Sequence, residues 1–388
     1  MTEKSPQNLD QFAAEKLTSI AQRGLMRELI DTDRTDAIHL RRNGREYLSF
    51  CCNDYLNLSR HREVQAAAAA AAHEYGAGAG SSRLVTGNHS LLSALERSLA
   101  DFKESEDCVV FGSGYLANVG IIPTLVGPDD LVIADALSHA CLLAGARISG
   151  ARELTFRHND LEHLEELLSQ YRGDVANCLI VTDGVFSMDG DRAPVTALAA
   201  LADKHGAWLM TDDAHGLGTL NNGKGSAIEN GVRANIPLQM GTLSKAAGSY
   251  GGYLCCSKQV AELIRNRART LIYSTGLPPA AVGASLKALE IIATDVERTQ
   301  RPLENARTFC RLLNLPEPES PIVPLILGSP EKALSAAAAL ATKGILVSAI
   351  RPPTVPEGTA RLRLTFTAEH SLQNIESLAD AIRVEKMI

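Results

Sequence analysis

Between residues 100 and 260, short apolar runs alternate with helical patterns, and this alternation restricts the chain to few folds. Segments of strand character recur as CVVF, DLVIAD, CLIVTD, AWLMTD, LQMGT and GGYLCC. The segments between several of them, such as LEHLEELLSQY and VTALAALADKHG, have the apolar spacing of amphipathic helices. Strands that alternate with helices form a mostly parallel sheet covered on both faces, and such sheets carry ligand groups at the carboxyl ends of their strands. We therefore predict a large α/β domain.

The segments that flank this region predict a three-part organisation. Residues 9–30 place apolar side chains at helical spacing, which predicts an amphipathic helix that packs on the body of the protein or on a partner subunit. After residue 280 a long helical pattern precedes a cluster of prolines at 316–321, and a shorter mixed segment follows. We expect an N-terminal helical arm and small segment over 1–50, a large ligand-binding domain over 51–288 and a smaller C-terminal α/β domain over 289–388.

Composition and charge exclude several classes of protein. The 388 residues carry 38 Lys and Arg against 45 Asp and Glu, a formal net charge of −7, whereas affinity for nucleic-acid phosphates requires clustered cations. The eight cysteines include two vicinal pairs, no C-x-x-C and several members of apolar runs, a pattern that indicates reduced thiols and not a disulfide or zinc framework. The N-terminus is polar, so we expect a cytoplasmic protein with neither a signal peptide nor a membrane-spanning helix.

Two glycine-rich segments resemble nucleotide-binding loops without matching them. GAGAGS at 76–81 follows a helical pattern, not a strand, and does not match G-x-G-x-x-G. GTLNNGK at 218–224 begins like a phosphate-binding loop, but Gly225 stands where Ser or Thr would hold magnesium. The chain also lacks G-x-S-x-G and H-E-x-x-H. We therefore expect neither a serine hydrolase nor a zinc hydrolase, and no metal site.

Polar residues follow two of the predicted strands. AWLMTDDAHG runs a strand into Asp212, Asp213 and His215, and LQMGTLSKAAG runs another into Thr242 and Lys245. Acids and an imidazole at one strand end cost free energy unless they serve a ligand. Taken singly, however, the two acids could instead cap a helix, and the lysine could lie in a solvent-exposed loop.

Together these groups have the chemistry that pyridoxal phosphate requires. A lysine can form a Schiff base, an upstream aspartate can hold a pyridinium nitrogen, and hydroxyls and amides can bind a phosphate. The amides of Ser113, Gly114 and Tyr115 would open a helix after the strand CVVF, which makes a ready anion site. His139 follows another strand and could stack on a flat cofactor. A plain strand-to-helix turn and a structural histidine are the simpler alternatives for these two segments.

The chain resembles the α-oxoamine synthases, a branch of the fold-type I pyridoxal phosphate enzymes. The resemblance covers nearly the whole chain and implies their fold, with a large domain around a mostly parallel sheet and a smaller C-terminal domain. The motifs that carry it are, in chain order, NDYLNLSRH, GSSRLVTGNHSLLSALE, FGSGYLANVG, DALSHACL, FRHND, FSMDGDRAPV, DDAHGLG, GTLSKAAGSYGGY, YSTGLPPA and RPPTVPEGTARLRLTFTAEH.

The resemblance implies roles for four residues at the reaction centre. Lys245 resembles the lysine that binds the cofactor covalently. Asp212 resembles the partner of the pyridinium nitrogen, and His215 resembles a hydrogen-bond donor to the cofactor's phenolic oxygen. His139 resembles the stacking histidine, and we expect it to support the ring and a developing oxyanion.

The remaining positions carried over from the family bind the rest of the cofactor or the substrate. Arg361 in GTARLR resembles the arginine that binds the amino-acid carboxylate, and Asn53 resembles another substrate-site residue. Ser274 and Thr275 resemble residues that reach the phosphate of the neighbouring subunit, which implies a homodimer with shared active sites. The other positions that resemble cofactor ligands are Ser113, Gly114, Tyr115, Ser187 and Thr242.

Three features depart from the family pattern. Asp183 stands where relatives often carry the longer Glu, which could alter a contact to substrate or cofactor. Cys141 replaces the more usual Ser, a small packing change. The N-terminal arginine that some relatives use aligns securely with neither Arg23 nor Arg27, so we assign a role to neither.

The resemblance implies a decarboxylative condensation of an amino acid with an acyl thioester. We expect the substrates to be L-alanine and pimeloyl-CoA or pimeloyl acyl carrier protein, because LSHACL, GTLSKAAGSYGGY and YSTGLPPA favour them. The alternatives with the same chemistry use glycine, as 2-amino-3-ketobutyrate CoA ligase and 5-aminolevulinate synthase do. A catalytically silent scaffold subunit would lack the Schiff-base lysine, which is present, and an aminotransferase fits the block at 351–370 less well.

Overall fold

The structure is a computed structural model that describes residues 8–229 and 231–387. A seven-stranded sheet forms its centre, with the strand order β4-β12-β11-β8-β7-β5-β6. Neighbouring strands in this sheet are parallel except at β12, which runs antiparallel to both β4 and β11. The prediction of a mostly parallel sheet is therefore confirmed. Its strands are β4 (Asp107–Phe111), β5 (Leu131–Asp135), β6 (Arg152–Phe156), β7 (Cys178–Asp183), β8 (Trp208–Asp212), β11 (Leu238–Thr242) and β12 (Gly252–Cys256).

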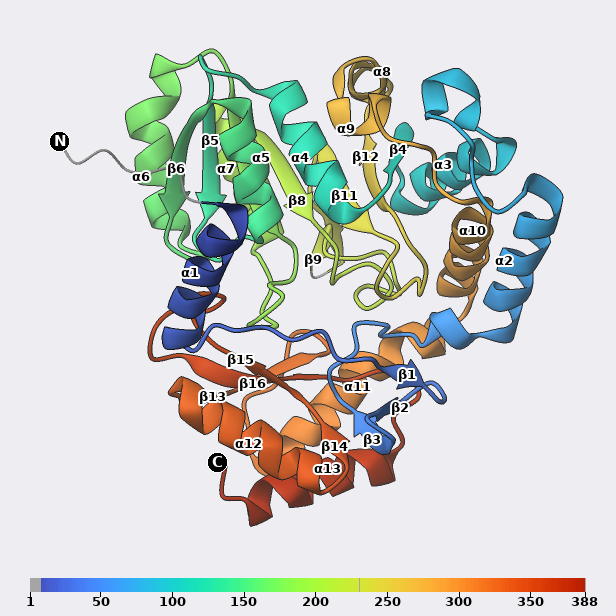
Figure 1. Ribbon diagram of the computed structural model, residues 1–388. Coiled ribbons are helices and arrows are strands. Elements are labelled where there is room, and N and C mark those ends of the chain that lie inside the picture. The colour runs from blue at the N-terminus through green and yellow to red at the C-terminus, as the bar shows by residue number, and fades with distance from the viewer. Residues whose placement is uncertain (1–7, 230, 388) are drawn as a thin grey trace.

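Helices cover both faces of the large sheet (Figure 1). Alternate residues of β4 show why, since Val110 packs with α3 and α10 on one face while Val109 packs with α4 and α8 on the other. The helices of the described residues are α1 (Leu9–Gln22), α2 (Arg62–Tyr75), α3 (Ser90–Lys103), α4 (Gly114–Leu125), α5 (Ala140–Ser149), α6 (Leu161–Tyr171), α7 (Val195–His205), α8 (Lys258–Arg267), α9 (Arg269–Ile272), α10 (Pro279–Thr294), α11 (Val296–Leu313), α12 (Pro330–Thr342) and α13 (Leu372–Val384). None of them is both long and apolar enough to cross a membrane.

The six apolar runs of the sequence all form strands of the large sheet, but the seventh strand was not predicted. β6 lies at the edge of the sheet beside β5, and its sequence RELTF leaves mainly polar side chains exposed. An edge strand is buried less than a central one, so it does not need a continuous apolar run.

Two predicted helices differ from the structure at their ends. The N-terminal helix spans Leu9–Gln22 and not 9–30, because Arg23 caps it and Gly24 follows at a φ of 65°. None of its residues is buried. The long pattern after residue 280 is two helices, since Asp295 ends α10 and its side chain caps α11 by accepting a hydrogen bond from the Arg298 amide (3.0 Å).

Two smaller sheets lie below the large sheet in Figure 1. In one, β16 (Ala360–Thr365) pairs antiparallel with β13 (Ile322–Gly328) and β15 (Ser348–Ile350). The other joins β1 (Asp33–Arg34), β2 (His39–Arg42), β3 (Arg45–Ser49) and β14 (Ile345–Leu346), so the N-terminal segment shares a sheet with the C-terminal part. The remaining strands, β9 (Ile228–Glu229) and β10 (Val232–Arg233), form a short ribbon.

The hydrophobic clusters change near the predicted domain boundaries. Phe50 belongs to the C-terminal cluster with Phe309 and Phe366, whereas Tyr55 and Ile292 belong to a cluster of the large sheet. We therefore propose one boundary near residue 51, as the sequence predicted, and a second boundary after α10, near residue 294, because the predicted boundary at 288 falls inside that helix. Residues 1–7 of the N-terminal arm lie outside the described residues.

Candidate active site

The predicted cofactor residues from several strand ends meet at one cavity of about 170 Å³. Asp212 ends β8 and Thr242 ends β11, while Ser113 and His139 follow β4 and β5. Parallel strands end at the same edge of the sheet, which brings these distant positions together. The cavity is lined by Ser113, Gly114, Tyr115, His139, Cys141, Asp183, Asp212, Ala214, His215, Met240, Thr242, Ser244 and Lys245.

The N-terminus of α4 forms one wall of the cavity. Ser113 caps this helix, and its Oγ accepts a hydrogen bond from the Leu116 amide (3.2 Å). Gly252 lets β12 approach closely, because a Cβ at that position would lie 2.5 Å from the Ser113 carbonyl oxygen. A helix of this length with hydroxyls beside its first amides offers a site for a phosphate.

Asp212 is buried with its carboxylate held from two directions. Oδ2 accepts a hydrogen bond from Asn118 Nδ2 (2.7 Å), and Oδ1 accepts one from the Ala214 amide (3.0 Å). These donors orient the carboxylate at the cavity wall. Sequence reasoning missed Asn118, which lies in the motif FGSGYLANVG one helical turn beyond Tyr115.

Lys245 is a buried amine whose charge is disfavoured. Burial lowers the pKa of Lys245, and the carboxylates of Asp212 and Asp183 offset only part of this effect. A lower pKa leaves more of the amine neutral and nucleophilic at neutral pH. This is the state that Schiff-base formation requires.

His139 caps α5 through its ring. Nδ1 accepts a hydrogen bond from the Cys141 amide (3.3 Å) and lies 2.7 Å from Cys141 Sγ. Burial lowers the pKa of His139, with the Asp212 charge partly opposing it. The neutral ring therefore carries its proton on Nε2, since Nδ1 acts as the acceptor.

Asp183 fixes the backbone of His139. Its Oδ2 accepts a hydrogen bond from the His139 amide at 2.7 Å. Burial, followed by the nearby Asp212 charge, raises the pKa of Asp183 well above its ordinary value. Asp183 therefore holds the His139 backbone and also lines the cavity.

His215 is buried against Tyr55, a residue that sequence reasoning missed. Its Nδ1 lies 2.7 Å from Tyr55 Oη. Burial lowers the pKa of His215 well below its ordinary value, and the charges of Lys245 and Arg363 add to this. Tyr55 belongs to the motif NDYL, but only the fold brings it to a strand end 160 positions away.

Arg361, the residue predicted to bind the amino-acid carboxylate, has partners within the protein. Its guanidinium already pairs with the Asp189 carboxylate and donates to the Met188 carbonyl oxygen (3.2 Å). Arg363 instead donates to Asn53 Oδ1 at 3.1 Å, and its charge lowers the pKa of Lys245 and His215. Arg363 is therefore close enough to Lys245 and His215 for its charge to act on both, whereas Arg361 pairs with Asp189.

The other predicted residues lie around the cavity or apart from it. Asn53 adjoins Arg363, and the backbone carbonyl of Ser187 accepts a hydrogen bond from Arg363 Nε. Ser274 and Thr275 are absent from the cavity lining and lie beside the segment that contains Ser82, with which Thr275 forms an isolated bridge. Their predicted role is at the phosphate of a second subunit.

The residues present fit pyridoxal phosphate. Lys245, Asp212 and His139 border the same small cavity, and the first amides of α4 adjoin it beside Thr242 and Ser244. A Cβ at Gly114 would lie 3.2 Å from Met240 Cε, so the backbone at the start of α4 packs closely against β11. Among the described residues no group of three His, Cys, Asp or Glu side chains is arranged to hold a metal ion.

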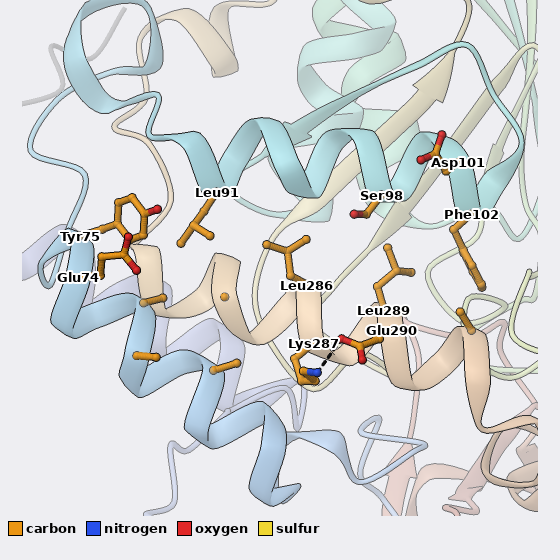
Figure 2. Close-up of a pocket in the computed structure, with 15 residues that line it drawn as sticks. Glu74, Tyr75, Leu91, Ser98, Asp101, Phe102, Leu286, Lys287, Leu289 and Glu290 are labelled. Carbon is orange, nitrogen blue, oxygen red and sulfur yellow. Dashed lines mark hydrogen bonds and ion pairs between the residues drawn. The ribbon is translucent and has the colours of Figure 1, made fainter.

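A larger cavity of about 760 Å³ lies elsewhere, between α2, α3 and α10 (Figure 2). Leu91, Leu286 and Leu289 project into it, and Lys287 pairs with Glu290 at its rim (2.6 Å). None of the predicted site residues lines it. Its size therefore reflects a gap between helices and not the position of the chemistry.

Comparison with known proteins supports the fold and the cofactor. Residues 45–382 match the family model of class I and II aminotransferases. An 8-amino-7-oxononanoate synthase of Beijerinckia indica is 55% identical over 97% of both chains. A serine palmitoyltransferase of S. paucimobilis with a bound PLP–myriocin aldimine superposes with a TM-score of 0.90, at 30% identity, over 98% of this chain and 100% of its own. The 8-amino-7-oxononanoate synthase of Francisella tularensis gives a TM-score of 0.74, at 27% identity, over 88% of this chain and 99% of its own.

Fold and site together define a fold-type I enzyme that uses pyridoxal phosphate as its cofactor. Within that class, the chain belongs to the 8-amino-7-oxononanoate synthase family of acyltransferases, which are enzymes of biotin biosynthesis.

Proposed function

We propose that this protein condenses L-alanine with a pimeloyl thioester to give 8-amino-7-oxononanoate, carbon dioxide and a free thiol. The observation that carries the proposal is the buried Lys245 amine, whose pKa is lowered beside Asp212 and Asp183 in a cavity walled by His139. The names of relatives that share more than half of their residues with this chain support the choice of substrates.

Several residues would hold the cofactor. When bound, pyridoxal phosphate supplies an electron-accepting ring that stabilises negative charge at the amino-acid Cα. Asp212 would keep the ring nitrogen protonated, His139 would lie against the ring, and His215 would donate from Nε2 to the phenolic oxygen. The first amides of α4, with Thr242, would bind the phosphate.

Two residues would bind the substrate carboxylate and transfer the proton. Arg363 would bind the alanine carboxylate with a charge-assisted hydrogen bond. The Lys245 amine would remove the Cα proton of alanine as general base. The Cα–acyl bond then forms as the carbon–sulfur bond of the thioester breaks, and the thiolate leaves and takes up a proton. The original carboxylate departs as carbon dioxide, and a proton returns to Cα.

We also propose that the enzyme is a homodimer with shared sites. Ser274 and Thr275 resemble family residues that reach the neighbouring subunit's phosphate, and they stand outside the cavity of their own chain. The eight free cysteines suit a reducing compartment, which supports a cytoplasmic location. Sedimentation of the purified protein tests the dimer, because a monomer with full turnover contradicts shared sites.

The experiment that tests the function measures thiol release by the purified holoenzyme with pimeloyl-CoA. We expect release to require L-alanine and to give the nine-carbon amino-oxo acid, which mass spectrometry identifies. Parallel reactions replace alanine with glycine, or CoA with an acyl carrier protein loaded with the same acyl group. Productive turnover with glycine alone would move the protein to the glycine-using synthases. No turnover with any pair would contradict the proposed reaction.

A further inference from the structure

A fully buried ion pair lies behind the cavity and takes no part in the reaction described above. Lys103 is the last residue of α3, and its Nζ donates to Asp213 Oδ2 at 2.9 Å. The two side chains are 1% and 2% exposed. Nζ also donates to the Lys224 carbonyl oxygen (2.6 Å), and Asp213 Oδ1 accepts from the Ser226 amide (3.0 Å). Each charged group of the pair therefore has a further hydrogen-bond partner.

Glycines form the walls around the Asp213 carboxylate. A Cβ at Gly216 would lie 1.9 Å from Asp213 Oδ1, and a Cβ at Gly225 would lie 1.8 Å from Oδ2. Gly225 also has a φ of 92°, which favours glycine for a second reason. The glycine-rich segment at 218–225 is therefore part of a cage for a carboxylate of the protein itself, which explains its likeness to a phosphate loop.

Asp213 is also the anchor of the turn that presents the cofactor ligands. Its amide donates to the Met240 carbonyl oxygen on β11 (2.8 Å), and its own carbonyl accepts from the Gly216 amide (3.1 Å). The residues on this turn are Asp212, whose Oδ1 accepts from the Ala214 amide, and His215. A shift of Asp213 would therefore move both ligands, because they share its backbone.

The pair also matters for charge. Asp183, Asp212 and Asp213 are all buried at neighbouring strand ends, and Lys245 faces the first two. Burial disfavours the charged form of Lys245, so its amine balances these carboxylates only in part. Lys103 then remains as the cation that compensates Asp213, and breaking a buried pair on one side leaves an uncompensated charge.

We propose that the Lys103–Asp213 ion pair is a positioning device that holds the Asp212–His215 turn in register with the cofactor. Lys103 is a positioning residue, since it touches neither the cavity lining nor the predicted substrate ligands. The proposal concerns cofactor binding and does not depend on which amino acid or acyl donor the enzyme uses.

The test compares Lys103→Met with the double variant Lys103→Met/Asp213→Asn. The single variant leaves a buried carboxylate alone, so we expect a lower urea midpoint of the apoprotein and a dissociation constant for pyridoxal phosphate raised about tenfold. The double variant removes both charges while Asn can still accept from Ser226. We expect it to recover the urea midpoint, because no charge is stranded, but to keep the weakened cofactor affinity.

The control is Arg265→Met, which breaks a partly exposed ion pair with Asp107 (2.7 Å) at the start of β4, away from the cavity. We expect this variant to lower the urea midpoint without changing the dissociation constant for the cofactor. The proposal is overturned if Lys103→Met binds the cofactor within twofold of the native protein. It is equally overturned if the double variant recovers stability and cofactor affinity together. If the single variant does not fold, the double variant alone tests the proposal, and native cofactor affinity in that variant would overturn it.

Discussion

The two sides of the candidate active site are built in different ways. The cofactor side comes from strand ends of a single sheet, where Asp212, Thr242 and the residues after β4 and β5 are placed by parallel pairing. The carboxylate side joins Asn53, the Ser187 loop and Arg363, which are separated by more than one hundred positions. The first side follows from local motifs, whereas the second depends on how the C-terminal strands meet the large sheet.

A histidine fixes the loop of the carboxylate side to the large sheet. His158 Nδ1 lies 2.9 Å from Asp135 Oδ1, and Nε2 lies 2.7 Å from Asp191 Oδ2. Asp135 ends β5, and Asp191 belongs to the loop that contains Ser187. His158 therefore ties the loop that receives both β16 arginines to a rigid strand end.

The largest expected effect is on the cofactor side. Lys245→Ala removes the amine that we propose to bind the cofactor and to move the Cα proton, so we expect turnover to fall by roughly 10³-fold or more. Thiol release measures turnover, and the absorbance of the bound cofactor reports its attachment. Lys258→Ala, at the first position of α8, is the matched control. Normal turnover by Lys245→Ala would remove the basis of the proposed function.

The two arginines of the carboxylate side should differ in their effect on alanine binding. We expect Arg363→Gln to raise the KM for alanine by roughly 10- to 100-fold, because it removes a charge-assisted hydrogen bond. Arg361→Gln should change that KM much less, since Arg361 pairs with Asp189. Steady-state kinetics with varied alanine checks both variants. An equal rise in the two would show that Arg361 also contacts substrate.

The His158 contacts predict how stability depends on pH. Burial opposes the charged ring, but hydrogen bonds with Asp135 and Asp191 outweigh it and raise the pKa of His158 to about 10. Since an unfolded histidine has a pKa near 6.5, this stabilisation is complete below about pH 6.5 and is lost as the pH rises toward about 10. Urea unfolding of His158→Gln should show a deficit of about 1 kcal/mol at pH 6, given the partial exposure. A deficit that stays constant up to pH 10 would contradict the assignment.

The smallest effect concerns Cys141. A serine hydroxyl can replace the thiol beside His139 Nδ1, so Cys141→Ser should change turnover by less than about threefold. Cys141→Val removes the polar group and should reduce turnover further. Thiol release by the two variants under identical conditions gives the comparison, and equal rates would mean that the Sγ contact with His139 has no role in turnover.

The sequence alone predicted the large sheet and most of the cofactor side. The apolar runs are buried between two layers of helices, so their composition reveals them. Asp212 and Lys245 stand directly after such runs, and a strand end is a position that a sequence pattern can locate. The edge strand β6 was missed because exposure on its outer side removes the apolar signal.

The tertiary structure decided the carboxylate side. Arg361 and Arg363 are two positions apart on β16, so they point to the same face of the strand and alternation does not separate them. Only the placement of the Ser187 loop assigns Asp189 to the first arginine and Asn53 to the second. The partner of Asp213 likewise could not be predicted from the sequence. Asp212 lines the cavity, whereas its neighbour Asp213 pairs with Lys103, which the fold brings from α3. Local composition determines which segments are buried as strands, but the partner of a buried charge is fixed by long-range packing.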